Sequence, residues 1–336
     1  MGPPEKEGPS PQQLGGRGGE RAGETNHRDL LGPDGFRRLS RYGTAKAATL
    51  RVVEEATPEA MRREGIRVAA VMKCADWMAF RHYPTLAQTK LHSANFCCVH
   101  LVCGFCAIRR GARMMARYLE RFRIVRQASP ELRPYLVTFT VKNGPDLCER
   151  LLHLERSLTR LNKRRSGKRS RSLMTTIAGA VWSYEVTYSE AKGWHPHVHA
   201  IWLATEQPDM HALRAEWKEI TLDSFMVDVR PIEPDAEAPA DIDPHAKGFA
   251  EVFKYAMKAA ELPARRLIDA YRVLNRRRLV RSFGKFYGVK EPGVGELSDE
   301  LPSGDELPYI DLLFRYSGAG RYVPSHTVRS AVAAPC

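Results

Sequence analysis

Histidines at alternate positions are the feature of this chain with the most chemical content. His197 and His199 flank Val198 in the run GWHPHVHAIWL. Side chains alternate between the two faces of a β-strand, so we expect both imidazoles on one face and Val198 in the core. An imidazole pair binds a divalent cation and leaves coordination positions open for a substrate. The spacing therefore predicts a catalytic metal site, with His195 as a neighbour.

A carboxylate is expected to complete this site. Hard cations such as Mg²⁺ and Mn²⁺ prefer oxygen ligands in addition to nitrogen. Glu185 lies on the preceding predicted strand and can supply that carboxylate. The alternative is that Glu185 is a surface glutamate on an exposed strand face.

A second candidate group lies in the run EVFKYAMK. Glu251 and Tyr255 are four residues apart, so on a helix they share a face and can address one site. A tyrosine is a poor base at neutral pH, but it can attack a polarised electrophile as a covalent nucleophile. Lys254 and Lys258 would stabilise a phenolate or a phosphate there. The alternative is an amphipathic helix with Tyr255 half in the core and solvated lysines.

The cysteines predict a structural zinc site. Cys98, Cys103 and Cys106 form the pattern C-x4-C-x2-C, and thiolates at x2 spacing fit around a tight turn. We expect Cys74 as the fourth ligand, and the other candidates are His92, Cys97 and His100. The alternatives are a group of buried thiols and a redox pair.

Charge points to a polyanionic partner. The 336 residues include 52 Lys and Arg against 39 Asp and Glu, a net charge of +13. Nucleic acid is the commonest partner of such a protein, although a basic surface can also serve solubility alone. We expect contacts with phosphates from residues 276–281 and from a basic cluster comprising Lys163, Arg164, Arg165, Lys168, Arg169 and Arg171.

The sequence also indicates the cellular compartment in which the protein is expected. Seven cysteines make an odd count, and the N-terminal run MGPPEKEGPSPQQ lacks the apolar core of a signal peptide. The sequence contains no apolar stretch of about 18 residues, the length that a membrane helix requires. We therefore expect a soluble cytoplasmic protein without a disulfide framework and without a membrane partner.

Alternation and periodicity place these residues on elements of an α+β domain. Its central sheet is expected to be largely antiparallel, with helices packed on one face. Asp146 is expected to cap a helix that carries regularly spaced leucines. Strands are predicted at 134–143, 180–189, 197–204 and 225–232, and helices at 208–221, from 249 onward and at 264–281.

Composition shifts predict four segments along the chain. The predicted segments are a disordered tail at 1–45, a cysteine-rich zinc-like element with a helix at 46–125, a catalytic domain at 126–290, and an irregular tail at 291–336.

Three runs in order, VTFTVKN, HPHVH and EVFKYAMK, resemble the three motifs of rolling-circle replication initiators, which are HUH endonucleases. The single-tyrosine plasmid Rep branch is the most similar, because of the C-x4-C-x2-C-x2-R-R segment and the later FGKFYG run. The resemblance covers residues 74–290 and implies an HUH-type domain at 126–290.

The resemblance implies roles for individual residues. His197 and His199 match the metal-binding pair, and Tyr255 matches the nucleophile that leaves a 5′-phosphotyrosine and a 3′-OH primer. Glu251 matches the glutamate that activates water at termination. The implied cofactor is Mg²⁺ or Mn²⁺, besides the structural zinc.

The implied partners are origin DNA, single-stranded or extruded as a hairpin at the nick site, and a host helicase and polymerase in a bacterial cytoplasm. Within the same chemistry, the alternatives are a transposase and a relaxase. From other classes, they are a non-catalytic zinc-containing nucleic-acid-binding protein and a zinc metallohydrolase.

Overall fold

The computed structural model describes residues 27–84, 88–166, 171–238, 243–253, 262–289 and 309–329. The chain divides into two compact units. The first takes its described residues from Met1–Ala47, Lys73–Cys97 and Asp299–Cys336, and the second takes them from Ala48–Met72 and Cys98–Ser298.

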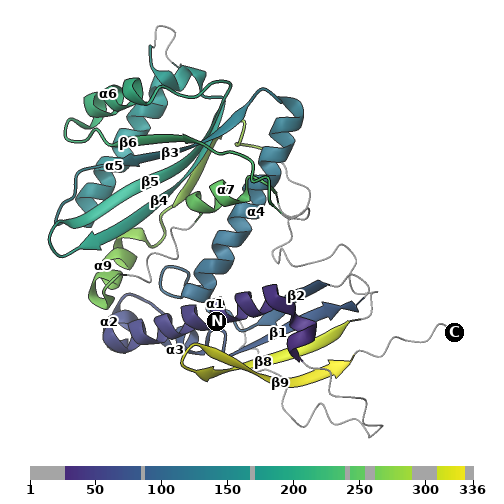
Figure 1. Ribbon diagram of the computed structural model, residues 1–336. Coiled ribbons are helices and arrows are strands. Elements are labelled where there is room, and N and C mark those ends of the chain that lie inside the picture. Colours follow the sequence, from purple (N-terminus) through teal and green to yellow (C-terminus); the bar gives the residue numbers. More distant parts are fainter. Residues whose placement is uncertain are drawn as a thin grey trace, which may run out of the picture. The chain divides into compact units, whose positions relative to one another are not determined.

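The second unit is built on a five-stranded sheet in the order β6-β3-β5-β4-β7 (Figure 1). Every neighbouring pair in it is antiparallel, which confirms the predicted α+β class with an antiparallel sheet. The strands are β3 (Arg133–Thr140), β4 (Gly179–Ser189), β5 (Gly193–Ala204), β6 (Val227–Pro231) and β7 (Val280–Gly284).

One face of this sheet is apolar and carries two of the helices. Phe139 of β3 lies against Trp202 of β5 with ring centroids 5.6 Å apart. Trp217 of α6 (Met210–Thr221) packs on Phe139 at 4.8 Å and donates its indole N–H to the Thr140 carbonyl at 2.8 Å. Four leucines of α5 (Leu147–Lys163) are buried on this side, and Val198 is fully buried. This face is the structural core that the alternation of β5 predicts.

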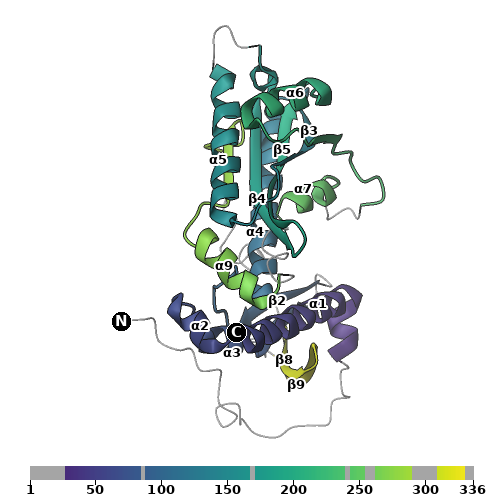
Figure 2. The same cartoon turned by 90° about the vertical axis from the view of Figure 1, so that its left-hand side faces the viewer.

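Helices also cover the opposite face, so the prediction of helices on one face is wrong. α7 (Ala246–Val252) contacts β5, and α4 (Gly104–Ala128) packs against α7 through Phe122 and Phe249, whose ring centroids are 5.3 Å apart. In Figure 2, α5 and α7 lie on opposite sides of the sheet. Phe249 and Val252 of α7 are the buried residues that hold it there.

Side-chain hydrogen bonds cap the N-termini of α5 and α6. Asp146 accepts a hydrogen bond from the Glu149 amide and starts α5, as the sequence predicts. Asp209 does the same for α6 through the amides of His211 and Ala212. The basic helix predicted at 264–281 ends earlier. α9 spans Ala264–Leu274, and Arg276 adopts a positive φ of 64° before β7 begins.

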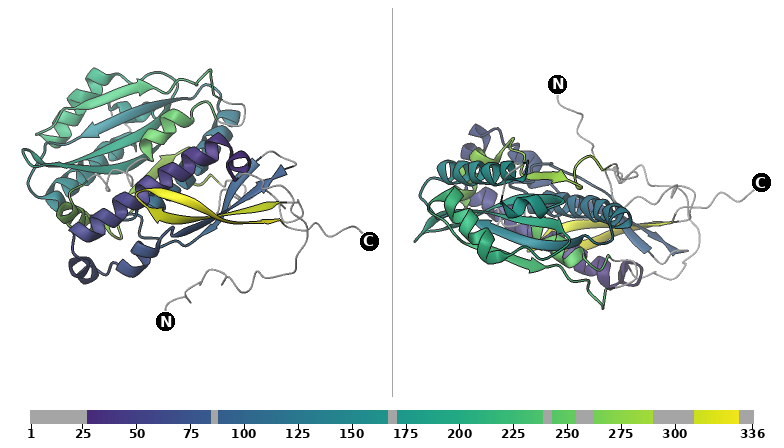
Figure 3. Two further views of the ribbon diagram at one scale, coloured as in Figure 1. Left: turned by 60° about the horizontal axis from the view of Figure 1, so that its bottom comes forward. Right: turned by 90° about the horizontal axis from the view of Figure 1, so that it is seen from above.

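The first unit contains a four-stranded antiparallel sheet in the order β2-β1-β8-β9. Its strands are β1 (Trp77–Tyr83), β2 (Gln88–Ala94), β8 (Ile310–Gly318) and β9 (Arg321–Arg329). The helix α1 (His27–Glu55), which has a break at Gly32, runs across this sheet (Figure 3). Lys46 of α1 reaches the Cys74 carbonyl at 2.8 Å and Asp76 at 2.5 Å.

This unit corrects the predicted segment boundaries. Residues 27–45 are helical rather than part of a disordered tail, and residues 310–318 and 321–329 are strands rather than an irregular tail. β1 pairs with β8 across more than 200 residues of sequence, and no local pattern indicates such a pairing. Two short helices, α2 (Pro58–Arg63) and α3 (Val68–Lys73), precede β1 in the chain and belong to the second unit, apart from Lys73. None of the helices in the described ranges is long and apolar enough to cross a membrane.

Candidate metal centre and active site

Glu185, His197 and His199 come together on the face of the second sheet that carries α7. In the register of the β4–β5 pair, Glu185 lies directly opposite His197. Its two carboxylate oxygens approach the two imidazoles: Oε1 is 3.1 Å from His197 Nε2, and Oε2 is 3.3 Å from His199 Nε2. The Glu185 side chain is buried, so it is not the exposed surface glutamate of the alternative interpretation.

This donor set suits a divalent cation. One ligand atom from each of the three residues lies within 4.8 Å of the other two. Two imidazole nitrogens and one carboxylate form a mixed nitrogen and oxygen set, and a metal ion held by these three residues would have coordination positions left for a substrate. A buried carboxylate is costly unless a cation or a hydrogen bond compensates its charge, and a metal at this point would do so.

Hydrogen bonds orient both imidazoles. The Nδ1 atom of His197 lies 3.3 Å from the His195 carbonyl, which can only accept, so a proton on Nδ1 can be donated there, and Nε2 would then be available to bind a metal ion. The Nδ1 atom of His199 lies 3.0 Å from the Thr138 hydroxyl on β3. Such outer contacts fix the tautomer and ring orientation of metal-binding histidines.

His195 lies beside this group rather than in it. Its ring stacks on that of His197 with centroids 5.2 Å apart, and its Nδ1 is 2.7 Å from the Asn143 side-chain oxygen. Burial lowers the pKa of His195, and the nearby His197 lowers it further. A neutral His195 held by Asn143 packs against the site without adding charge to it.

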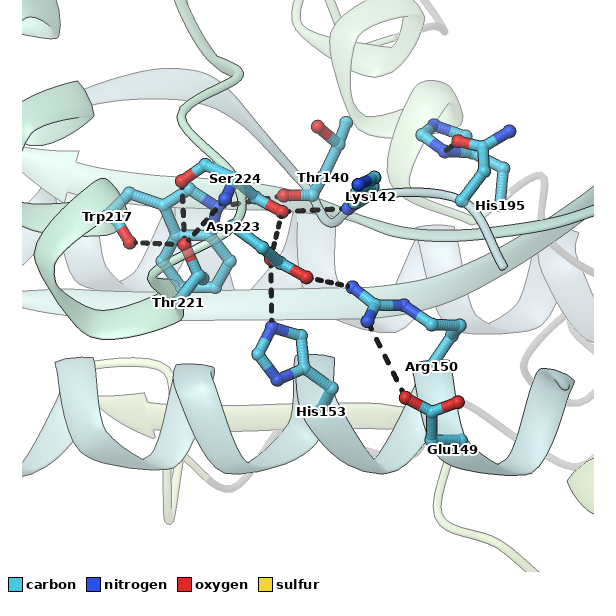
Figure 4. A network of polar contacts seen from close by, with 11 residues as sticks. Thr140, Lys142, Glu149, Arg150, His153, His195, Trp217, Thr221, Asp223 and Ser224 are labelled. Carbon is cyan, nitrogen blue, oxygen red and sulfur yellow. Dashed lines mark hydrogen bonds and ion pairs between the residues drawn. The ribbon is translucent and has the colours of Figure 1, made fainter. Parts of the chain in front are cut away.

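A polar network holds the chain at Lys142, just after β3 (Figure 4). Asp223 accepts hydrogen bonds from Arg150 at 2.8 Å and from the Ser224 hydroxyl at 2.6 Å, and His153 approaches it at 3.2 Å. The Ser224 hydroxyl in turn accepts from the Lys142 amide at 2.7 Å. The end of α6 and the start of α5 thereby fix the residue next to Asn143.

An open pocket adjoins the histidines. Its volume is about 1030 Å³, and it is lined by Thr138, Thr140 and His199 from the sheet and by Glu251 from α7. The structure therefore brings Glu251 to the same face as the predicted metal ligands. The strand that carries His199 and the helix that carries Glu251 therefore meet at one cavity.

The C-terminal end of α7 is tied to the sheet beside the histidines. The Ser183 hydroxyl donates to the Val252 carbonyl, and Ser183 is the register partner of His199. Gly111 of α4 passes so close to Phe253 that an added Cβ would lie 2.7 Å from the Phe253 carbonyl oxygen. Tyr255, Lys254 and Lys258 lie outside the described residues.

Comparison with known proteins identifies the family. A family model described as replication protein matches residues 88–301, more than half of the chain. The chain belongs to this family of replication proteins. Protein rep of a Bacillus species is 26% identical over 216 residues, which cover 57% of this chain and 66% of that relative, just under two thirds of its length. No solved structure matches. The resemblance to rolling-circle plasmid replication initiators is thereby confirmed.

The replication protein also has a cysteine cluster. The sulfur atoms of Cys74, Cys97, Cys103 and Cys106 all lie within 4.8 Å of one another, and all four side chains are buried. Cys98 is exposed with a positive φ of 60°, which turns its side chain away, so the sequence assigns Cys98 where the structure has Cys97. Among the described residues, this group includes neither His92 nor His100. Tetrahedral zinc places thiolates about 3.8 Å apart at Zn–S bonds of about 2.3 Å, so the cluster fits that ion.

The predicted phosphate-binding cluster is only partly available to DNA. Arg164 forms ion pairs with Glu216 at 3.2 Å and Glu219 at 2.8 Å, and Arg165 lies over the Phe283 ring at 4.4 Å. Lys163 and Arg171 are exposed. Lys168 and Arg169 fall outside the described residues.

The predicted basic region at 276–281 is divided in the same way. Arg277 and Arg281 both pair with Glu155, at 2.9 and 3.8 Å. Arg276 and Arg278 are exposed. Arg277 and Arg281 are therefore engaged in ion pairs with α5.

Sequence reasoning did not identify Thr138, Asn143 and Ser183 as site residues. The alternation of TFT in β3 places Thr138 on the histidine face, which is a usable signal once strand pairing is known. Asn143 and Ser183 act through contacts with distant segments, so their roles become visible only in three dimensions.

Proposed function

We propose that this replication protein initiates rolling-circle plasmid replication by nicking and rejoining origin DNA. The observation that supports this most strongly is the convergence of Glu185 on His197 and His199 beside the end of α7. Tyr255 follows Val252 by three residues, so the backbone between them spans at most about 11 Å.

In this proposal His197 and His199 bind a divalent cation through Nε2, and Glu185 binds it through its carboxylate. The bound ion, Mg²⁺ or Mn²⁺, would polarise the scissile phosphate and offset charge that develops on it. Thr138 and the His195 carbonyl hold the imidazoles in the required orientation. The family membership and the donor set support a metal here, and the identity of the ion is part of the proposal.

Tyr255 performs the cleavage in the proposed reaction. Its phenolic oxygen bonds to phosphorus as the bond from phosphorus to the 3′ oxygen breaks, and the phenolic proton is lost to solvent. The 3′ oxygen takes up a proton and becomes the 3′-OH that primes a polymerase. The phosphodiester energy is retained in the tyrosine link, so rejoining needs no ATP.

Glu251 closes the cycle in the proposed reaction. It lines the pocket that His199 also lines, so its carboxylate can take a proton from water at the same face. That water attacks the phosphotyrosine, the bond between phosphorus and the tyrosine oxygen breaks, and Tyr255 is released. Lys254 and Lys258 would steady the phosphate during both steps.

The proposed partners follow from this chemistry. The substrate is origin DNA, single-stranded or extruded as a hairpin at the nick site, and a host helicase and polymerase extend the new 3′-OH in the bacterial cytoplasm. We further propose that Cys74, Cys97, Cys103 and Cys106 bind a structural zinc ion. Lys163 and Arg171 remain candidates for contacts with phosphates.

A nicking assay tests the proposal. Supercoiled plasmid carrying the cognate origin is incubated with Mg²⁺ or Mn²⁺ and either the wild type or Tyr255→Phe. The wild type should yield open-circular DNA, whereas the variant should yield none. Equal nicking by both would exclude the tyrosine mechanism, and no nicking by the wild type would favour a non-catalytic binding protein.

End-labelled oligonucleotides separate the proposal from a metallohydrolase. With a tyrosine nucleophile, the strand portion 3′ of the nick carries the protein on its 5′ end, so a 3′ label shifts to protein mass on a denaturing gel. A 5′ label should run as free DNA. A hydrolase would release both products free of protein.

A further inference from the structure

A second pocket in the second unit lies between α4 and residues 278–288, the segment that contains β7 and the turn after it. Its volume is about 450 Å³, and none of its lining residues belongs to the histidine group. That size falls at the lower end of the roughly 300–1,000 Å³ typical of small-ligand pockets. It suits single nucleotides of an unpaired strand better than the broad surface of a duplex.

The charged side chains that line this pocket in the described residues are all arginines. Arg110, Arg117 and Arg121 of α4 line it together with Arg278, and the described residues that line it include no acidic side chain. The three α4 arginines follow one another at intervals of seven and four residues, so they form a stripe on one helix face. A concave site lined by cations attracts a polyanion strongly.

Contacts between α4 and the β7 region fix the floor of the pocket. The Tyr118 hydroxyl hydrogen bonds to Ser282 at 3.2 Å, and Arg121 donates to the Phe286 carbonyl at 3.2 Å. The Tyr118 ring also stacks on Phe253, with centroids 5.5 Å apart and an interplanar angle of 19°. Phe253 precedes Tyr255 by two residues, so one side chain both lines the pocket and packs against the segment that leads to the candidate nucleophile.

An exposed aromatic ring lies at the rim of the pocket. Tyr287 is 68% exposed and sits in a tight turn whose amide bonds back to the Gly284 carbonyl at 2.8 Å. Aromatic rings that accompany a basic groove bind single strands, because every base offers a face for stacking. An exposed tyrosine on a fixed turn beside four arginines has this character.

We propose that this pocket, defined by Arg110, Arg117, Arg121, Arg278 and Tyr287, binds the single-stranded DNA that flanks the nick. The arginines contact its phosphates, and Tyr287 stacks on a base. The proposal rests on the proposed nicking function, because that function supplies the single strand beside Tyr255. It adds a binding site separate from the metal centre and from the Lys163–Arg171 cluster.

Salt-dependent binding tests the arginines. Anisotropy of a labelled single-stranded oligonucleotide is measured with the full chain carrying Tyr255→Phe, which blocks covalent capture. Adding Arg117→Gln or Arg278→Gln should lower the slope of log affinity against log salt by about 0.7 each, or roughly fivefold in affinity at 0.1 M salt. Arg117→Lys should retain most of the slope.

Arg156→Gln is the matched control, because Arg156 is an exposed arginine on α5, which covers the other face of the sheet. It removes the same charge and should leave the slope unchanged. Equal losses from Arg156→Gln and Arg117→Gln would show only a general charge effect and overturn the proposed site. Circular dichroism and melting temperature verify that each variant folds.

Tyr287 tests the stacking contact. Tyr287→Ala should weaken binding of the single strand on the order of 5- to 100-fold, whereas Tyr287→Phe should bind as the parent does. Neither change should alter the affinity for a blunt duplex of the same sequence. Equal loss for duplex and single strand would contradict the assignment to unpaired DNA.

The binding assay and the nicking assay test the pocket proposal and the proposed function separately. If the wild type nicks DNA and the arginine and Tyr287 variants bind single strands normally, the pocket proposal is wrong and the proposed function stands. If those variants lose affinity as expected while the wild type forms no nick, the pocket stands as a single-strand site and the nicking function is wrong.

Discussion

Glu185 and His197 face each other across the β4–β5 pair, and Oε1 of the glutamate lies 3.1 Å from Nε2 of the histidine. Since the same carboxylate reaches His199 with its other oxygen at 3.3 Å, one buried side chain contacts both imidazoles. This arrangement makes Glu185 the residue on which the proposed metal site depends most.

Glu185→Gln should weaken Mn²⁺ binding by at least about 10- to 100-fold, because it keeps the size of the side chain but removes the charge. Isothermal titration calorimetry measures the change. Glu206→Gln, an exposed glutamate after β5, is the control and should bind as the wild type does. Unchanged affinity in Glu185→Gln would remove this residue from the ligand set.

Thr138→Val should weaken Mn²⁺ binding about tenfold, because it deletes the hydroxyl that lies 3.0 Å from His199 Nδ1. Thr140→Val changes a neighbouring threonine on the same strand face, whose hydroxyl instead bonds to the Met226 carbonyl. Titration of both variants should show a loss only in Thr138→Val. An equal loss in both would point to a general effect on β3.

Ser183→Ala should slow nicking about tenfold while Mn²⁺ affinity stays unchanged, because it releases the end of α7 from the sheet without touching a metal ligand. Single-turnover nicking and calorimetry separate the two effects. Ser189→Ala, at the exposed end of β4, should change neither quantity. A parallel loss of metal affinity in Ser183→Ala would contradict the assigned role.

Asp223→Asn should lower the free energy of unfolding by about 2 kcal/mol at pH 7, because Arg150 and Ser224 lose their anionic acceptor. Urea denaturation measures the change. Glu149→Gln alters a second carboxylate near Arg150, at 3.8 Å and largely exposed, and should change stability little.

The same variant predicts a pH dependence. Burial raises the pKa of Asp223, but hydrogen bonds from Ser224 and Arg150 outweigh it and leave that pKa below the usual 3.8. A carboxylate whose pKa falls on folding stabilises the protein above its unfolded pKa, and this contribution is lost as pH falls further. The difference between wild type and Asp223→Asn should therefore shrink below about pH 4. A difference that grows there would contradict the hydrogen-bonding account.

Zinc content distinguishes the two adjacent cysteines. The wild type should bind about one zinc ion per chain, Cys97→Ser should lose it, and Cys98→Ser should retain it, because only Cys97 lies in the buried cluster. Mass spectrometry of metals in the purified proteins measures the ratio. Loss of zinc in Cys98→Ser would restore the ligand that the sequence pattern indicates.

Local patterns in the sequence predict the parts of this fold that depend on residues close together in the chain. Alternation in β5 places His197 and His199 on one face and Val198 in the core, and Asp146 marks the start of α5. The choice of Glu185 follows from pairing between adjacent strands, which a short connection enforces. These predictions concern residues whose partners are close in sequence.

The features that the sequence does not reveal depend on distant contacts. The sequence predicts an irregular tail where the structure has β8, because the partner strand β1 lies more than 200 residues away. Cys97 is buried in the thiol cluster, whereas its neighbour Cys98, which has a positive φ, is exposed, and the sequence pattern does not show this difference. The sequence predicts that Arg164 contacts phosphate, whereas in the structure it forms ion pairs with Glu216 and Glu219 of α6.

In the proposed reaction, Tyr255 attacks a DNA phosphate beside the Glu185, His197 and His199 group. Mass spectrometry of the protein trapped on an origin oligonucleotide identifies the modified residue. We expect a phosphotyrosine-linked adduct on Tyr255 that disappears in Tyr255→Phe. An adduct on Tyr287, which is exposed in the basic pocket, or on Tyr271, or cleavage without any adduct, would contradict it.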